Sequence, residues 1–429
     1  MSGVYDCLVI GAGPGGLAAA ATAAEAGLQV GLEDDNPAAG GQIWRRGNAA
    51  VSVSHSAEQW MERIRSAKVD VLCGWRATDA GTDALGTPFI RVEGLGGFRD
   101  LRYRKLILAT GARELFLPFP GWTLPGIYGA GGLQAFAKSG FDVRGMRVVL
   151  AGTGPLLMAV TAHLHEAGAK IVAVVEQAPL SRLMSLGMHL APSAPGKLME
   201  GLRYRLRTMG TKYYFGHWVS EARGDGKLER LTITNGSESF AVEADLLGVG
   251  YHLVPNTELA QLLGCGLENG FVRVEETQET SCTSIYCIGE ATGIGGVDKA
   301  QVEGRIAGFS AAGRIEKARS LFAARDKQLR FVERLAAAFA LREELRGLAQ
   351  ENTLVCRCED VPHGALRECH SWREAKLHTR CGMGPCQGRI CGPATQFLYG
   401  WHAPAPRPPV FPASVGTIAA VDEAGVHHE

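Results

Sequence analysis

Five cysteines near the C-terminal end of the sequence could together hold a metal centre. They lie in two groups within 36 residues: Cys356 and Cys358, then Cys381, Cys386 and Cys391. Thiolate sulfurs are the ligands that iron–sulfur clusters and structural zinc prefer, and four of them complete either kind of site. The sequence therefore predicts a metal centre here, of an electron-transferring or a structural kind.

A glycine-rich loop close to the N-terminus predicts a dinucleotide site. An apolar run at 6–10 precedes the loop, an Ala-rich segment reaches residue 26, and a second apolar run covers 27–34; the loop itself holds Gly11, Gly13, Pro14 and Gly16. Such glycines let backbone amides approach a pyrophosphate at a helix N-terminus, and an acid ending the next strand can bind a ribose hydroxyl. Of the adjacent acids 33–35, alternation along the strand favours Asp34.

Three further motifs accompany the loop. One strand ends in Ala109-Thr110-Gly111, another ends in Gly289-Glu290, and a Pro-Ala-Ala-Gly stretch leads to Gly41, Gln42 and Arg45. Over roughly residues 4–310 these motifs resemble the two-dinucleotide-binding-domain flavoproteins of the pyridine nucleotide–disulfide reductase superfamily. The resemblance implies an FAD bound by Gly11, Gly13, Pro14, Gly16, Asp34, Gly41, Gln42, Arg45, Ala109, Thr110, Gly111, Gly289 and Glu290.

Two departures from that superfamily matter. Glu290 stands where the superfamily has an aspartate, although the longer acid can still accept a hydroxyl hydrogen bond. No Cys-x-x-Cys occurs in the body, which excludes the redox dithiol of thioredoxin-reductase-like enzymes.

A second strand–loop–helix begins at residue 147, and the resemblance makes it an inserted NAD(P)-like domain. Its loop contains Gly152 and Gly154 but has Leu157 at the third glycine position, where bulk would push helix and strand apart. No basic pair follows Glu176 to receive a 2′-phosphate, which disfavours NADPH. Three interpretations of this loop stay open: an NADH site, a non-redox adenine nucleotide site and an empty relic.

The cysteine segment resembles the 2Fe–2S module of bacterioferritin-associated ferredoxin, which also occurs in the large subunits of amine dehydrogenases. Those subunits end the motif in Cys-Gln-Gly-Arg-x-Cys, so the resemblance implies Cys356, Cys358, Cys386 and Cys391 as ligands. Cys381 is an alternative ligand. A structural zinc and a decayed site are the other interpretations, although zinc sites usually use Cys-x-x-Cys.

Three more segments, 119–126, 289–296 and 407–412, extend the resemblance nearly end to end. With the cysteine motif they resemble the FAD/iron–sulfur subunit of hetero-oligomeric amino acid and amine dehydrogenases, the group of D-hydroxyproline dehydrogenase, opine oxidase and hydrogen cyanide synthase. The resemblance implies an electron-transfer subunit of an oxidoreductase for CH–NH donors that is linked to a dye or quinone. Its partners would be a D-amino-acid-oxidase-like flavoprotein, which oxidises the substrate, and a small ferredoxin-like subunit.

The expected fold class is α/β, with an FAD domain over 1–115 and 248–315 and an inserted NAD(P)-like domain over 116–247. A helical connector (316–350), a 2Fe–2S module (351–400) and a Pro-rich tail (401–429) follow. We expect the stretch 403–412 to run extended over a partner or the body, or to stay free.

Composition limits the function further. Lys+Arg and Asp+Glu are equal at 44 each, so no global field attracts nucleic acid, and membrane association is at most peripheral. No signal peptide or apolar span is present, so we expect a cytoplasmic protein, with the inner face of the membrane as an alternative. No His/Asp or paired-carboxylate constellation marks a catalytic base. The preferred substrate is D-hydroxyproline, ahead of an opine and of glycine converted to cyanide; the alternative function is a self-sufficient NADH-dependent flavin/iron–sulfur reductase.

Overall fold

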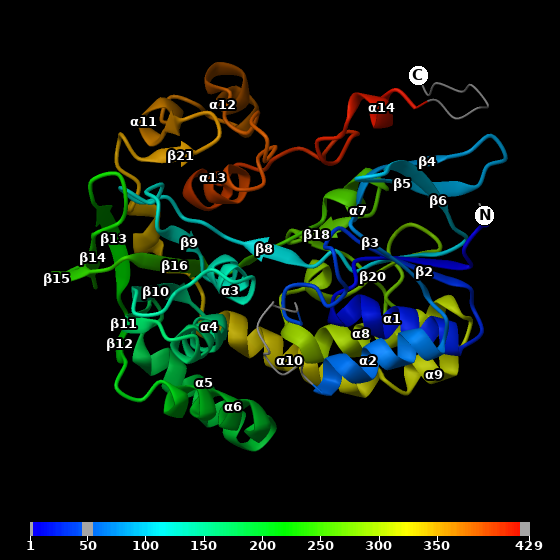
Figure 1. Ribbon diagram of the computed structural model, residues 1–429, viewed down its shortest axis with the longest axis horizontal. Helices are drawn as coiled ribbons and strands as arrows, with labels where there is room; N and C mark the ends of the chain where they lie inside the picture. The colour runs from blue at the N-terminus through cyan, green and yellow to red at the C-terminus, as the bar shows by residue number, and fades with distance from the viewer. Residues whose placement is uncertain (1–2, 45–54, 421–429) are drawn as a thin grey trace.

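Two five-stranded parallel sheets form the body of the molecule in the computed structural model, which describes residues 3–44 and 55–420 (Figure 1). The first sheet has the order β20-β7-β1-β2-β3 and the second β12-β11-β10-β16-β9. The expected α/β architecture is therefore confirmed. The first sheet consists of β1 (Cys7–Ile10), β2 (Val30–Asp34), β3 (Asp70–Cys73), β7 (Leu106–Leu108) and β20 (Ile285–Cys287).

The second sheet repeats this plan. It consists of β9 (Ile127–Gly129), β10 (Arg147–Thr153), β11 (Lys170–Glu176), β12 (Lys212–Phe215) and β16 (Leu246–Tyr251). Each parallel sheet has a three-stranded antiparallel companion: β4 (Trp75–Thr82), β5 (Pro88–Gly94) and β6 (Gly97–Arg102), or β13 (Trp218–Arg223), β14 (Arg230–Thr234) and β15 (Ser239–Glu243). Two strands, β8 (Ala112–Glu114) and β17 (Leu253–Pro255), pair antiparallel where the chain crosses between the units. Strand β16 of the second sheet ends at Tyr251, shortly before β17.

Helices α1 (Pro14–Glu25), α2 (His55–Ser66) and α8 (Gly296–Ala311) lie together on one side of the first sheet (Figure 1). Alternate residues of β1 face opposite layers: Cys7 and Val9 contact the α1 side, whereas Leu8 and Ile10 contact the β4–β6 side. The Ala-rich sequence of α1 lets α8 approach closely. A Cβ on Gly304 would overlap the Gly15 carbonyl oxygen and lie 3.1 Å from the Ala18 Cβ.

Helices α3 (Ala130–Lys138), α4 (Pro155–Glu166), α5 (Leu180–Ser193) and α6 (Pro195–Arg207) belong to the inserted unit. Leu157, expected to force α4 away from the sheet, is 1% exposed within the core. Its Cδ2 lies 3.9 Å from where a Cβ on Gly250 would stand. The sheet therefore accommodates the bulk of Leu157 because β16 has a glycine opposite it.

The C-terminal part begins with a helical connector made of α9 (Ile315–Arg319), α10 (Phe322–Ala338) and η2 (Glu343–Gly347). The cysteine module follows, with β21 (Leu354–Cys356), β22 (Val361–Pro362), α11 (His363–Leu366), α12 (Trp372–Thr379) and α13 (Cys391–Tyr399). The Trp122 Nε1–H donates to the Leu354 carbonyl oxygen at 2.6 Å, which ties the module to the inserted unit. Within 3–44 and 55–420, no helix is long and apolar enough to cross a membrane.

The tail lies across the body and ties the module to the first unit. From α13 the chain crosses to the β4–β6 sheet, where α14 (Val415–Ile418) rests (Figure 1). The Val410 N–H donates to the Thr78 carbonyl oxygen at 2.7 Å, and Arg91 donates to the Ala420 carbonyl oxygen at 2.8 Å. The Pro-rich stretch therefore acts as a strap between the module and β4–β6.

Substitution Gly304→Ala should destabilise the fold by about 1–3 kcal/mol, because the added methyl overlaps the backbone of α1. Gly187→Ala is the matched control, since Gly187 is also helical and a Cβ there meets nothing within 4 Å. Alanine at this control position should raise the free energy of unfolding by up to about 1 kcal/mol. Urea unfolding followed by circular dichroism measures both; equal midpoints for the two variants would contradict the tight α1–α8 contact.

Candidate functional site

The glycine loop between β1 and α1 is closed by Asp34. The Ala12 N–H donates to Asp34 Oδ2 at 2.6 Å, and the Asn36 N–H donates to Oδ1 at 2.8 Å. The neighbouring Glu33 side chain is 2% exposed, and burial raises its pKa well above the usual range. Asp34 is thus the acid beside the loop, in the place where the sequence suggested a ribose-binding carboxylate.

The start of α1 fits a pyrophosphate. Gly13 caps the helix without a side-chain hydrogen bond, and no acid stands in the first turn. A Cβ on Gly13 would meet nothing within 4 Å, whereas one on Gly16 would overlap the Gly11 carbonyl oxygen. The amides at this helix end are therefore not blocked by a side chain, as binding of a diphosphate requires.

The stretch that follows β2 lies over this helix start. The Gly40 N–H donates to the Ala12 carbonyl oxygen at 2.8 Å, and a Cβ on Gly41 would lie 2.9 Å from Gly13 Cα. Gln42 follows with an exposed side chain. Arg45, the last residue expected in this stretch, lies outside the described residues.

The Ala109-Thr110-Gly111 strand end is clamped by Asn256. Thr110 Oγ1 donates to the Asn256 carbonyl oxygen at 2.5 Å, and Asn256 Nδ2 donates to the Thr110 carbonyl oxygen at 2.9 Å. The Asn256 N–H donates to the Gly111 carbonyl oxygen at 3.0 Å. Asn256 was not among the expected site residues, because its role depends on a contact between segments 146 residues apart.

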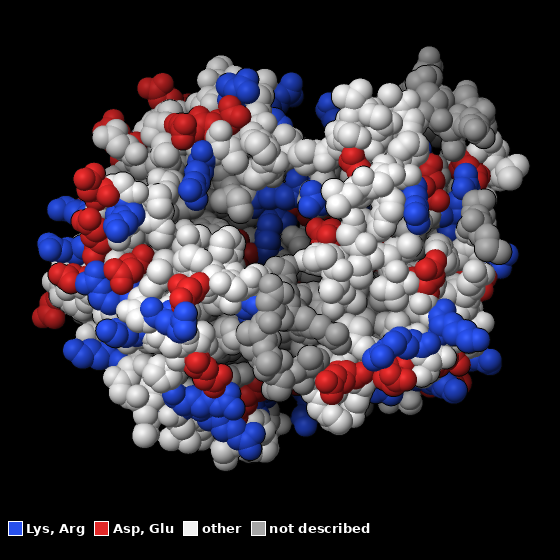
Figure 2. Space-filling model, in the orientation of Figure 1, with Lys and Arg blue, Asp and Glu red and all other residues white. Residues whose placement is uncertain are grey.

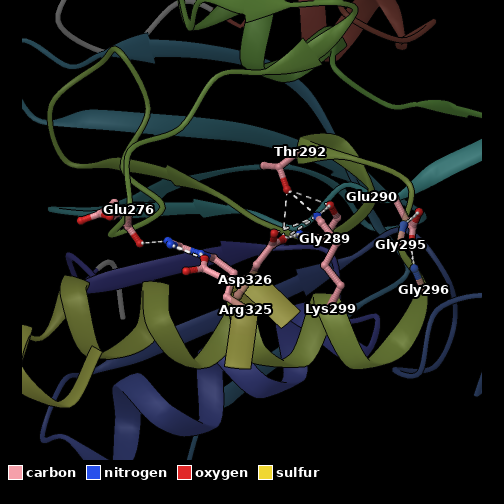
Figure 3. A network of polar contacts seen from close by, with 10 residues as sticks. Glu276, Gly289, Glu290, Thr292, Gly295, Gly296, Lys299, Arg325 and Asp326 are labelled. Carbon is pink, nitrogen blue, oxygen red and sulfur yellow. Dashed lines mark hydrogen bonds and ion pairs between the residues drawn. The ribbon is translucent and has the colours of Figure 1, made fainter. Parts of the chain in front are cut away.

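Glu290 closes the turn that starts α8 (Figure 3). Its carboxylate accepts the N–H groups of Gly296 at 2.7 Å and Gly295 at 3.1 Å. Burial raises the pKa of Glu290, and the two amides oppose that rise. The acid therefore shapes the loop, and its remaining lone pairs fit the acceptor role that the resemblance implies.

A buried ion pair fixes Gly289 (Figure 3). Lys299 Nζ lies 2.8 Å from Glu303 Oε1, with side chains 1% and 3% exposed, and it donates to the Gly289 carbonyl oxygen at 2.8 Å. Glu303 Oε2 accepts the Gly289 N–H at 2.8 Å. Both polar groups of Gly289 are thereby held. The signal in the sequence was a Lys and a Glu four residues apart in an Ala/Gly-rich helix.

The second nucleotide loop is hydrogen-bonded to the acid that ends β11. Glu176 accepts from Thr153 Oγ1 at 2.7 Å, the Gly154 N–H at 2.8 Å and the Ala178 N–H at 2.8 Å. Gln177 Nε2 donates to the Phe339 and Ala340 carbonyl oxygens, both at 3.3 Å. The segment that follows α10 is therefore held beside the end of β11.

All five clustered cysteines come together in the module. The sulfurs of Cys356, Cys381 and Cys391 lie within 4.8 Å of one another and are buried. Hydrogen bonds from Cys381 and Cys391 lower the pKa of Cys356, and one from Cys391 lowers the pKa of Cys386 to about 5. Cys358, which is exposed, forms a hydrogen bond with Cys386.

The donor set fits a metal cluster. Of the four expected ligands, Cys356 and Cys391 belong with Cys381 to the group of three sulfurs within 4.8 Å, and Cys386 interacts with Cys391 and Cys358. Backbone amides of Gly382 and Gly388 also donate to the sulfurs of Cys356 and Cys386. Amides that point at sulfurs stabilise thiolate ligands and tune a cluster's potential.

An arginine junction connects the two candidate cofactor sites. Arg113 Nη1 lies 2.9 Å from Glu258 Oε1 and donates to Asn256 Oδ1 at 2.7 Å, while its Nε donates to the Arg389 carbonyl oxygen at 3.0 Å. Arg389 Nε lies 3.8 Å from the same Glu258 oxygen. Figure 2 shows a hollow between the two halves of the molecule with Lys or Arg side chains in its depth.

Comparisons with known proteins agree with this architecture. Residues 5–307 match the family model described as "Pyridine nucleotide-disulphide oxidoreductase". The chain is 32% identical to the hydrogen cyanide synthase subunit HcnB of Pseudomonas aeruginosa, over 90% of each chain. It is 30% identical to an opine oxidase subunit of Rhizobium meliloti, over 98% of this chain and 99% of the other.

Two solved structures share the fold. L-proline dehydrogenase from P. horikoshii aligns with a TM-score of 0.68 at 18% identity, covering 97% of this chain and 80% of that one. Thioredoxin reductase from T. acidophilum aligns with a TM-score of 0.57 at 21% identity, covering 72% of this chain and 98% of that one. The body is thus a flavoprotein-type α/β fold.

Lys299→Met should cost about 3–5 kcal/mol of folding stability, because it leaves the buried Glu303 carboxylate unpaired. The double variant Lys299→Met/Glu303→Gln should regain part of this loss by removing the charge. Arg319→Met is the control, since its ion pair with Glu316 is exposed and worth less than about 1 kcal/mol. Denaturant unfolding of the variants tests this, and additive single and double effects would contradict a coupled pair.

The raised pKa of Glu176 predicts that the stability of the fold depends on pH. Burial raises its pKa from 4.5 to about 7 in the folded chain, so its stabilising effect is complete below pH 4.5 and is lost as pH rises through 7. Relative to Glu176→Gln, the free energy of unfolding of the wild type should fall by up to about 3 kcal/mol between pH 4.5 and 8. Unfolding free energies measured across this range test the difference; a constant difference would contradict the raised pKa.

Proposed function

The chain belongs to the pyridine nucleotide-disulphide oxidoreductase family, and we propose that it is the FAD/2Fe–2S electron-transfer subunit of a hetero-oligomeric dehydrogenase. Its complex would oxidise an amino or imino acid at a CH–NH bond and deliver the electrons to a respiratory acceptor. Two relatives that cover nearly the whole chain are named as enzyme subunits, which supports a role within a larger assembly.

The observation that carries the proposal is the arrangement of the two candidate sites. When bound, FAD would supply two-electron chemistry and a 2Fe–2S cluster would supply one-electron transfer. Asn256 holds the Thr110 strand end, and Arg113 joins Asn256 to the backbone of the cysteine module. The residues that would hold each group are therefore linked by direct polar contacts.

The second nucleotide fold argues against the alternative, an NADH-dependent reductase. The connector is hydrogen-bonded to Gln177 beside this loop, and Leu157 takes the place of the third glycine. For the substrate of the complex, D-hydroxyproline is the first candidate to test. An opine and glycine are next, because the relatives include an opine oxidase subunit and a hydrogen cyanide synthase subunit.

Metal and flavin analysis of anaerobically purified protein tests the proposal. The wild type should contain FAD with about two iron and two acid-labile sulfide per chain. Cys386→Ala should lose iron and sulfide but keep FAD, because the Cys386 sulfur interacts with those of Cys358 and Cys391. Cys369→Ala is the control, since the Cys369 thiol donates instead to the Ala365 carbonyl oxygen, and this variant should leave both contents unchanged.

The fifth thiol decides the ligand set in the same assay. Cys381→Ala should retain iron and Cys358→Ala should lose it if the four expected cysteines are the ligands. The reverse result would assign Cys381, and not Cys358, to the ligand set. A wild type that binds zinc but neither iron nor sulfide would overturn the proposed function.

A further inference from the structure

The helical hairpin of α5 and α6 presents an apolar outer face to solvent. Along α5 the exposed side chains recur every four residues, and on α6 they continue past the helix end. We call this set the methionine face; with the exposed fraction of each residue it comprises Leu180 (50%), Met184 (61%), Met188 (71%), Met199 (51%), Leu202 (49%), Leu206 (65%) and Met209 (73%). Large apolar side chains exposed together on one two-helix element mark a candidate interaction site.

The opposite side of the hairpin is firmly packed. Leu183 and Leu186 of α5 contact a core that contains Ala338 and Phe339 of the connector. Gly201 of α6 faces the Met158 side chain of α4, whose Cε would lie 3.7 Å from a Cβ added to that glycine. The methionine face is therefore the outer side of an anchored element, and none of its members belongs to a core cluster of the described residues.

Arginines border the methionine face. On a helix, Arg203 and Arg207 fall on one side of the row that contains Met199 and Leu206, and Arg205 falls on the other. All three arginines are exposed, although Arg207 Nη1 lies 3.4 Å from Glu166 Oε1 of α4 and the Arg205 guanidinium lies 4.5 Å from the centre of the Tyr213 ring. Figure 2 shows blue side chains, with some red ones beside them, among white ones at the lower left, where α6 lies in Figure 1. A complementary surface would have an apolar centre and carboxylates around it.

The charge and composition of the face distinguish between possible occupants. The hairpin has more Lys and Arg than Asp and Glu, so a second copy in a two-fold contact would bring two net positive surfaces together. A membrane-binding face usually carries Trp, Tyr or Phe, and none of the seven members is aromatic. Methionines adapt readily to a protein surface. A different, acidic protein is therefore the occupant that fits.

The hairpin is also tied to the candidate flavin site. Lys197 Nζ in the first turn of α6 lies 2.9 Å from Asp298 Oδ2 in the first turn of α8. That turn begins with Gly296, whose N–H donates to Glu290. A protein seated on the methionine face would thus rest on an element linked directly to the loop expected to hold FAD.

We propose that the methionine face is the docking surface for the substrate-oxidising partner subunit, which presents an apolar patch bordered by Asp and Glu. This inference rests on the proposed function, since that function requires a second subunit. Methionine and leucine side chains would supply the buried contact area, and Arg203, Arg205 and Arg207 would steer and orient the partner.

A binding experiment with the D-amino-acid-oxidase-like flavoprotein as the probe tests the proposal. Met188→Glu/Leu206→Glu should weaken the complex at least about 100-fold by placing charges in the apolar centre. Leu85→Glu/Leu95→Glu is the matched control, because both leucines are exposed in the turns of β4–β6, and its affinity should stay within about threefold of wild type. Arg203→Glu/Arg207→Glu should slow association and reduce its salt dependence. Isothermal titration calorimetry measures the affinities, and stopped-flow mixing measures the association rates. Circular dichroism and the FAD content show whether each variant is folded.

The outcomes separate the docking surface from the proposed function. If both double variants of the face bind the partner like wild type, the docking surface is overturned while the function stands. If wild type binds no partner, the function itself is contradicted. Self-association, or flotation with anionic lipid vesicles, that is abolished by Met188→Glu/Leu206→Glu would assign the face to a second copy or a membrane and overturn the proposal.

Discussion

The Arg113–Glu258 ion pair is the contact on which the relation between the two candidate cofactor sites depends. Arg113 stands on the crossover strand β8 and reaches both Asn256, which clamps the Thr110 strand end, and the backbone of the cysteine module. A charged group with several simultaneous partners in a partly buried place holds its neighbours more tightly than separate neutral bonds would. The module is thereby held at the edge of the body, where the domains cross.

Local patterns predicted much of the first unit. The strand, glycine loop and Ala-rich helix appear where expected, because a short apolar run, a glycine-rich turn and an Ala-rich stretch follow one another in the sequence. Asp34 was found by strand alternation alone. Asn256, Lys299 and Glu303 were not assigned to the site, since their roles depend on which backbone groups the fold brings to them.

The cysteine module shows both the strength and the limit of sequence pattern. The spacing placed all five thiols in one segment, and the structure brings their sulfurs together. Spacing could not rank Cys381 against the others, because burial and sulfur contacts decide that order. Sequence pattern could not predict the path of the tail either. Val410 contacts Thr78 through one backbone hydrogen bond, and these residues are more than 300 positions apart in the sequence.

The connector beside the second glycine loop has a consequence for the engineering of this chain. Phe339 and Ala340 supply carbonyl oxygens to Gln177, so the residue after β11 anchors the segment that leads to the cysteines. A substitution of Gln177 would remove these hydrogen bonds and loosen that segment. Any redesign of this loop must therefore also provide new partners for residues 339–342.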